Sequence, residues 1–179
     1  MFDATTHATL NTVQITGSGW QASAYVAITS DDSKAYVTNI VGNSVTEIDL
    51  TTRTVTRTFT GFSGPRGLTL TADESGLWVG NSDPGSNVLS LIDLTSGTVS
   101  RTVTIGYGAL EMALSPDGSQ LAVGQGQENF ISLVDTQTFQ VTQAPVGDPQ
   151  ASTGSNGKTG PWGVAYAPGG ATLYVGVEY

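Results

Sequence analysis

Residues 34–55 read KAYVTNIVGNSVTEIDLTTRTV, and their pattern decides the fold. Polar and apolar residues alternate in two short runs, which a turn around Gly42 and Asn43 separates, and a second turn at TTR precedes a third run. Alternation with a period of two is typical of β-strands, and Gly and Asn are typical turn residues. The stretch is therefore expected to form consecutive antiparallel strands.

The same pattern recurs along the chain. Four stretches align with one another: TSDDSKAYVTN (29–39), TADESGLWVGN (71–81), SPDGSQLAVGQ (115–125) and APGGATLYVGV (167–177). Their shared valines are Val37, Val79, Val123 and Val175, and these follow one another after 42, 44 and 52 residues. A second motif recurs in phase as EIDLTTRTV (47–55), LIDLTSGTV (91–99) and LVDTQTFQV (133–141). Four antiparallel strands per roughly 40–45 residues is the period of a β-propeller blade.

We therefore predict an all-β fold, a β-propeller of four-stranded antiparallel blades. Whole blades are expected at about residues 24–59, 67–104 and 110–143 of a single domain, with partial blades at 1–16 and 162–179. Equivalent positions are expected to pack between neighbouring blades, and these are Tyr36, Trp78, Ala122 and Tyr174. The repeated aspartates are expected to stabilise tight turns: Asp31, Asp49, Asp93, Asp117 and Asp135.

Composition limits the classes of partner. Six basic and fifteen acidic residues give a net charge of -9, which repels nucleic acid and anionic membrane surfaces. The chain has no cysteine, so disulfides and thiolate metal sites are excluded. No apolar run reaches the length of a bilayer span, and Met1 to Leu10 shows no secretion signal, so membrane insertion is not expected.

The motifs AYVTN, VTEIDLTTRTV, VLSLIDLTSGTV and LSPDGSQLAV resemble the YVTN family of β-propeller repeats, and the likeness covers nearly the whole chain from Asp3 onward. Propellers of this family usually have seven blades. The resemblance also implies an extracellular, cell-surface or periplasmic location, and many such propellers are binding or structural modules. Related propellers include lactonases and quinoprotein or haem enzymes. No catalytic signature of those enzymes can be placed on this chain, and His7 is its single histidine, so no catalytic residue, cofactor or metal ligand is predicted.

The two ends of the chain divide one blade between them. FDATTHATL (2–10) matches IDLTTRTVT (48–56), so the chain is expected to open at the end of a third strand and to continue through a fourth at residues 12–15. Residues 173–179 read as a second strand. Three arrangements remain open: a four-bladed ring in one molecule, a two-fold eight-bladed dimer, which we favour, or a piece of a longer or filamentous assembly.

One set of aligned positions, at the start of the innermost strands, carries a different residue type in each repeat. Ala24, Arg66, Leu110 and Trp162 align at the start of the innermost strands, and Tyr25, Gly67, Glu111 and Gly163 lie beside them. Tyr25, Arg66, Glu111 and Trp162 are therefore the candidate ligand-binding residues, for a small polar or sugar-like ligand. The alternative is that Arg66 and Glu111 only pair with each other at the mouth of the channel.

Other segments have weaker functional signals. Residues 144–163 form a Gly/Ser/Pro-rich insertion, expected to be a surface loop that is either a lid, a subunit contact or neutral variation. NSDPGSN (81–87) is expected to be a turn rather than a calcium site at Asp83.

We predict a non-enzymatic interaction or structural module that self-associates or binds another protein. The alternatives are a propeller enzyme of the lactonase or quinoprotein type, or a single-stranded nucleic-acid binder that stacks bases on Trp20, Tyr25 or Trp162, which the net charge disfavours.

Overall fold

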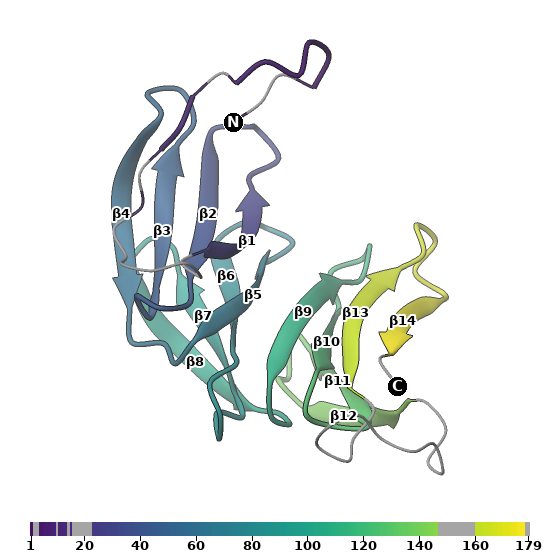
Figure 1. Ribbon diagram of the computed structural model, residues 1–179. Helices are drawn as coiled ribbons and strands as arrows, with labels where there is room; N and C mark the ends of the chain where they lie inside the picture. The colour runs from purple at the N-terminus through teal and green to yellow at the C-terminus, as the bar shows by residue number, and fades with distance from the viewer. Residues whose placement is uncertain (2–3, 10, 14, 16–22, 147–159, 178–179) are drawn as a thin grey trace.

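The computed structural model describes residues 1, 4–9, 11–13, 15, 23–146 and 160–177 of the chain. Within them it contains fourteen β-strands and no helix, arranged as successive sheets around an open arc (Figure 1). No helix long and apolar enough to cross a bilayer occurs in these residues. The predicted all-β architecture of four-stranded antiparallel sheets is confirmed.

Three sheets have four strands each, in the order in which the strands occur in the chain. The first contains β1 (Ser23–Ile28), β2 (Lys34–Asn39), β3 (Ser44–Asp49) and β4 (Thr54–Thr60). The second contains β5 (Pro65–Leu70), β6 (Gly76–Asn81), β7 (Val88–Asp93) and β8 (Thr98–Thr104). The third contains β9 (Ala109–Leu114), β10 (Gln120–Gln125), β11 (Phe130–Asp135) and β12 (Val141–Pro145). The fourth sheet has two described strands, β13 (Pro161–Tyr166) and β14 (Leu173–Val177).

The repeated aspartates stabilise the turns, as predicted. After β1, β5 and β9, a Thr or Ser hydroxyl donates a hydrogen bond to the aspartate two residues later; the Thr29–Asp31 and Thr71–Asp73 distances are both 2.7 Å and the Ser115–Asp117 distance is 2.6 Å. After β3, β7 and β11, the aspartate at the end of the strand accepts a backbone N–H three residues later. These side-chain bonds replace backbone partners that a tight turn leaves unpaired.

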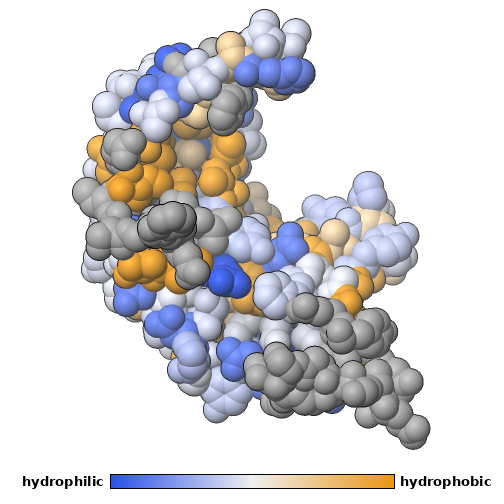
Figure 2. Space-filling view, viewed as in Figure 1, coloured by the Kyte–Doolittle hydropathy of each residue, from blue (hydrophilic) through white to orange (hydrophobic). Residues whose placement is uncertain are grey.

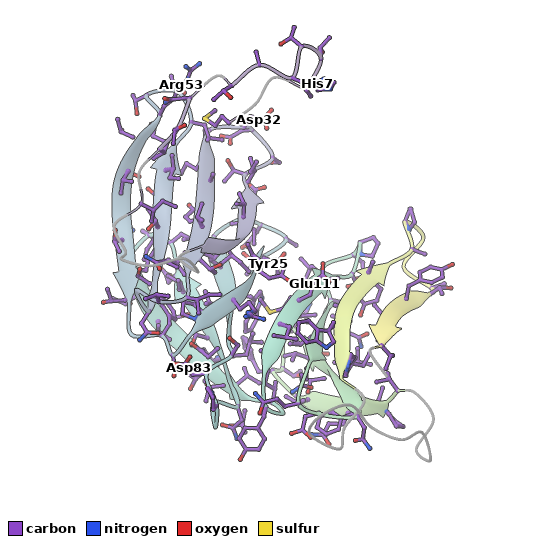
Figure 3. The ribbon with its side chains drawn as sticks, in the orientation of Figure 1. His7, Tyr25, Asp32, Arg53, Asp83 and Glu111 are labelled. Atoms are coloured by element: carbon purple, nitrogen blue, oxygen red, sulfur yellow. The ribbon has the colours of Figure 1, made fainter. Side chains whose placement is uncertain are left out.

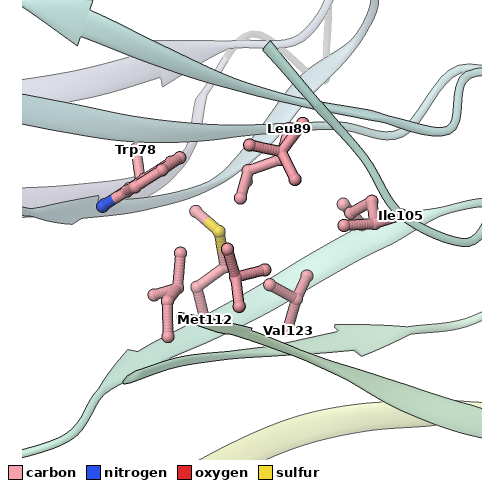
Figure 4. Close-up of a cluster of buried hydrophobic side chains, with 9 residues drawn as sticks. Trp78, Leu89, Ile105, Met112 and Val123 are labelled. Atoms are coloured by element: carbon pink, nitrogen blue, oxygen red, sulfur yellow. The ribbon is translucent and has the colours of Figure 1, made fainter. Parts of the chain in front are cut away.

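Apolar side chains pack between successive sheets. Tyr36, Val45 and Phe59 of the first sheet meet Leu77 and Val79 of the second. In the same way Trp78 and Leu89 of the second sheet meet Met112, Leu121 and Val123 of the third, as Figure 4 shows for this cluster. Because both faces of the middle strands are covered by neighbours, β2, β3 and β6 are buried along nearly their whole length, whereas β4 and β8 are mostly exposed.

The interface between the first two sheets contains a buried carboxylate. Tyr36 donates its hydroxyl to Glu47 at 3.2 Å, Thr56 donates to the same carboxylate at 2.7 Å, and Lys34 forms an ion pair with it at 3.4 Å. Burial, followed by the charge of Glu47, raises the pKa of Tyr36 to about 12. Burial also acts to raise the pKa of Glu47, but the bonds from Thr56 and Lys34 outweigh it and hold that pKa below its usual value.

The two ends of the arc stay apart, and the described residues of the N-terminal segment are not in the expected strand. In Figure 1 the first sheet and the β13–β14 pair lie at opposite ends of the arc. Thr12, Val13 and Ile15, expected to lie in a fourth strand, are not in a β-strand. Instead Val13 and Ile15 pack on Ala35, Val37 and Ile48, the face of the first sheet that no other sheet covers. The apolar pattern of the segment is thus satisfied by packing on this face.

Replacement of Trp78 by alanine tests the packing between sheets. Trp78 is 1% exposed between the second and third sheets, so Trp78→Ala should lower the free energy of unfolding by about 3–5 kcal/mol through lost burial and a residual cavity. Chemical denaturation measures the change. Val99→Ala, at an exposed position on β8, is the control and should change stability by less than about 0.5 kcal/mol. Equal effects of the two substitutions would contradict this packing.

The turn aspartates predict loss of stability in acid. Hydrogen bonds from Ser115 and Ser119 lower the pKa of Asp117 from 3.8 to about 2. Because the folded-state pKa is depressed, the contribution of Asp117 is present above its unfolded value and is lost as the pH falls from about 4 to about 2. Asp117→Asn and Ser115→Ala should each flatten the pH dependence of the unfolding free energy in this window, measured by urea denaturation. Curves parallel to that of the unsubstituted protein would contradict the role of this turn.

Candidate functional site

The innermost strands bring the candidate residues to one side of the arc. β1, β5, β9 and β13 pack against one another in sequence, so corresponding positions on them lie along the concave side. In Figure 3 Tyr25 on β1 and Glu111 on β9 both lie toward the opening of the arc. A site here is therefore built from segments that are about forty residues apart in the sequence.

A bulge interrupts each innermost strand at the candidate residues. Pairing between β1 and β2 shifts register between Ser23 and Val26, and pairing between β5 and β6 shifts between Pro65 and Leu68. Corresponding shifts occur between Ala109 and Met112 on β9 and between Pro161 and Gly163 on β13. A bulge leaves residues outside the ladder and redirects their side chains. Tyr25, Arg66, Glu111 and Trp162 all lie in these interruptions.

In the three complete sheets, the residue after the repeated valine lies against the innermost strand of the following sheet, close to its bulge. An added Cβ at Gly80 would lie 2.9 Å from Cβ of Ala109, and one at Gly124 would lie 3.0 Å from the Pro161 carbonyl oxygen. In the first sheet this position is Thr38, whose hydroxyl accepts the Tyr25 N–H at 3.1 Å and donates to the Arg66 carbonyl at 3.2 Å. Thr38 thereby links the first two bulges.

Three of the four candidate residues come together. Tyr25, Arg66 and Glu111 are each half-buried, and the charges of Arg66 and Glu111 both act on the Tyr25 phenol. Oε2 of Glu111 lies 3.0 Å from the place where a Cβ of Gly163 would be, so Glu111 extends over the glycine of the next innermost strand. We call Tyr25, Arg66 and Glu111 the concave cluster.

Trp162 lies at the rim of this cluster. Its side chain is 48% exposed, and its Cε2 atom lies 3.8 Å from the position of a Cβ at Gly126, beside Leu110. Gly126 follows β10, so the indole is placed next to the turn between β10 and β11. Trp162 is thus available to a ligand or protein that reaches over the rim.

The polar groups of the concave cluster are not paired with one another. Among the described residues the ion pair within 4.0 Å is Lys34–Glu47, so the predicted alternative of a direct Arg66–Glu111 pair is not found there. Nε of Arg66 is buried and has no hydrogen-bond partner in the described part of the chain. Burial, then the charge of Glu111, raises the pKa of Tyr25, and the charge of Arg66 opposes that rise. The cluster therefore presents a cation, a carboxylate and a neutral phenol to the same space.

The remaining sequence candidates are less informative. The Asp83 carboxylate accepts the Ser63 hydroxyl at 3.0 Å, and its backbone carbonyl accepts the Ser86 N–H, which fits the predicted turn. Trp20 and most of the 144–163 insertion lie outside the described residues. Sequence reasoning located the ring but missed the bulges that aim its side chains. The signal was present in the Gly that follows the repeated valine in WVGN and AVGQ.

Comparison with known proteins supports the architecture. No family model and no curated protein matches the chain. The solved structure of hydrazine synthase from Kuenenia stuttgartiensis is similar over 90% of this chain, with a TM-score of 0.74 and 22% sequence identity. The present chain spans 44% of that hydrazine synthase chain. This chain has a β-propeller-like fold. At this identity the likeness concerns the fold of the propeller alone, and membership of the YVTN family stays a prediction.

The ionisation of Tyr25 tests the geometry of the concave cluster. Arg66→Gln should raise the pKa of Tyr25 further, because it removes a cation that favours the phenolate. Glu111→Gln should lower it, because it removes a carboxylate that disfavours the phenolate. Carbon-13 NMR titration of labelled tyrosine, with Tyr25→Phe used for assignment, measures both changes. Shifts of the same sign in the two variants would show that these residues do not surround the phenol.

Proposed function

We propose that this chain is a non-enzymatic propeller module that joins a second copy of itself through the two ends of its arc. The observation that carries this proposal is that both ends expose faces that are buried wherever two sheets meet inside the molecule. Each contact between successive sheets joins two different faces. The free face at one end of the arc is therefore complementary in shape to the free face at the other end.

The end formed by β1 exposes apolar side chains. Val26 is 60% exposed, whereas Leu68 at the equivalent position of the second sheet is 7% exposed. Ile28 on the same strand is 52% exposed. Figure 2 shows apolar side chains gathered over the first sheet on the side of the opening. Removal of such a face from water is favourable at about 25 cal/mol per Å².

The end formed by β13 and β14 lacks a covering sheet. Tyr174 is 65% exposed, although the equivalent Tyr36 and Trp78 are 2% and 1% exposed. Among the described strands β14 pairs with β13 alone, whereas β2, β6 and β10 each pair with strands on both sides. An unpaired strand edge is a template for pairing with another segment. We call the exposed face with Val26 and Ile28 the β1 end of the arc, and the exposed face with Tyr174 the β14 end.

The N-terminal segment supports a copy of this chain as the occupant. Its sequence matches the end of a third strand and a fourth strand, and the β13–β14 sheet contains a first and a second strand within the described residues. Val13 and Ile15 already lie on the first sheet, at the side where a preceding sheet would pack. If β13 and β14 of a second copy dock there, the segment of one molecule extends the sheet of the other. Two such contacts close a two-fold ring.

Molar mass tests this proposal. Light scattering should give twice the 18.4 kDa of one chain. Ile28→Lys should reduce the mass to that of one chain, because it places a charge in the contact between the β1 end and the β14 end. Val99→Lys, an equivalent substitution on the outer strand β8, is the control and should leave the mass unchanged.

A mass of one chain for the unsubstituted protein at all concentrations would contradict self-association. Species that grow with concentration would retain the contact but contradict the closed ring, because an end-to-end contact that does not close builds a filament.

A further inference from the structure

The concave cluster contains two opposite charges that are not paired within the described part of the chain. Arg66 and Glu111 come from neighbouring innermost strands and are both half-buried. Among the described residues they form no ion pair within 4.0 Å. Nε of Arg66 is buried and has no hydrogen-bond partner there. A half-buried charge without a partner has lost part of its hydration without replacement. The cluster is therefore able to bind charged groups of a ligand.

The attachment points of the two charged side chains are set by the backbone. Arg66 and Glu111 lie in the bulges of β5 and β9, and the carbonyl of Arg66 accepts a hydrogen bond from Thr38. A bulge leaves its residue outside the ladder and redirects the side chain. The two charged side chains therefore start from separate, neighbouring innermost strands of one scaffold.

We propose that the concave cluster binds a small zwitterion, with its carboxylate on Arg66 and its ammonium group on Glu111. The guanidinium presents a planar array of donors that matches a carboxylate, and a carboxylate accepts from an ammonium group. Tyr25, half-buried on the neighbouring strand β1, is close enough for both charges to act on its phenol, and its hydroxyl can donate to a carboxylate or accept from an ammonium group.

A ligand of a single charge fits this site less well. A simple anion would pair with Arg66 but would lie near Glu111, in a protein of net charge -9. A simple cation would pair with Glu111 and would be repelled by Arg66. A zwitterion satisfies both residues at once and carries no net charge into the site. Because Arg66 and Glu111 are more than 4.0 Å apart, the ligand needs a spacer between its charged groups.

Titration with a series of ω-amino acids tests the proposal. Glycine, β-alanine and γ-aminobutyrate are added to the full chain, and acetate and methylammonium serve as fragments with one charge. The Tyr25 ring signal in NMR spectra reports binding at the cluster. At least one zwitterion should bind saturably, with an affinity at least about tenfold above that of either fragment. The spacer length that binds best reports the gap between the charges.

Substitutions assign the binding to the proposed residues. Arg66→Gln and Glu111→Gln should each weaken binding of the best zwitterion at least about tenfold, and Arg66→Lys should retain part of it because it keeps the charge but loses the planar array of donors. Arg53→Gln, at an exposed arginine in the turn between β3 and β4, is the matched control and should leave the affinity unchanged. Circular dichroism confirms that each variant is folded.

Three outcomes would overturn the proposal. These are the absence of saturable binding by every zwitterion, equal binding of acetate, and binding that survives both Arg66→Gln and Glu111→Gln. The test is independent of self-association, because the three residues of the cluster belong to one chain. The Ile28→Lys variant should therefore bind the same zwitterion with the same affinity, whatever its molar mass.

Discussion

Apolar packing between consecutive sheets is the interaction on which the rest of this structure depends. No sheet could bury its own faces, because each is one layer thick, and the middle strands are apolar on both sides. The two contacts between complete sheets each join a face that carries Tyr36 or Trp78 to a face that carries Leu77 or Leu121. Since the two faces differ, the arc has a direction, and its two ends expose complementary surfaces rather than identical ones.

The same packing explains why chemical variation is concentrated on the concave side. Contact between sheets aligns their innermost strands, and the bulge in each of those strands places its side chains outside the ladder. Residues in the bulges do not have to be apolar, and Arg66 and Glu111 are not part of the apolar contact between sheets. The repeat consequently keeps one backbone geometry and places a phenol, a guanidinium and a carboxylate on it. A rigid repeated scaffold with variable side chains is a common basis for binding sites.

Polar groups inside the interfaces show how the repeats have diverged. In the first sheet Tyr36 donates to Glu47. In the second sheet Trp78 occupies the position of Tyr36 and Leu91 that of Glu47, and the indole N–H has no partner. A buried donor without an acceptor costs about 1–3 kcal/mol, and burial of the large apolar surface of an indole acts in the opposite direction. The apolar interface between sheets therefore accommodates different polar groups from one sheet to the next.

The amino-acid sequence by itself determined the all-β class, the strands of the three complete sheets and the turns that join them. These features are encoded locally, by period-two alternation and by aspartates such as Asp31 and Asp117, each of which accepts the backbone N–H of the residue two positions later. Aligning the repeats also located the ring of candidate residues. Only the tertiary structure decided that Tyr25, Arg66 and Glu111 lie on neighbouring strands, close enough for both charges to act on the phenol, and that Val13 and Ile15 pack on a sheet face. Those outcomes depend on register shifts and on which distant faces come into contact, and neither is written in the spacing of residues along one strand.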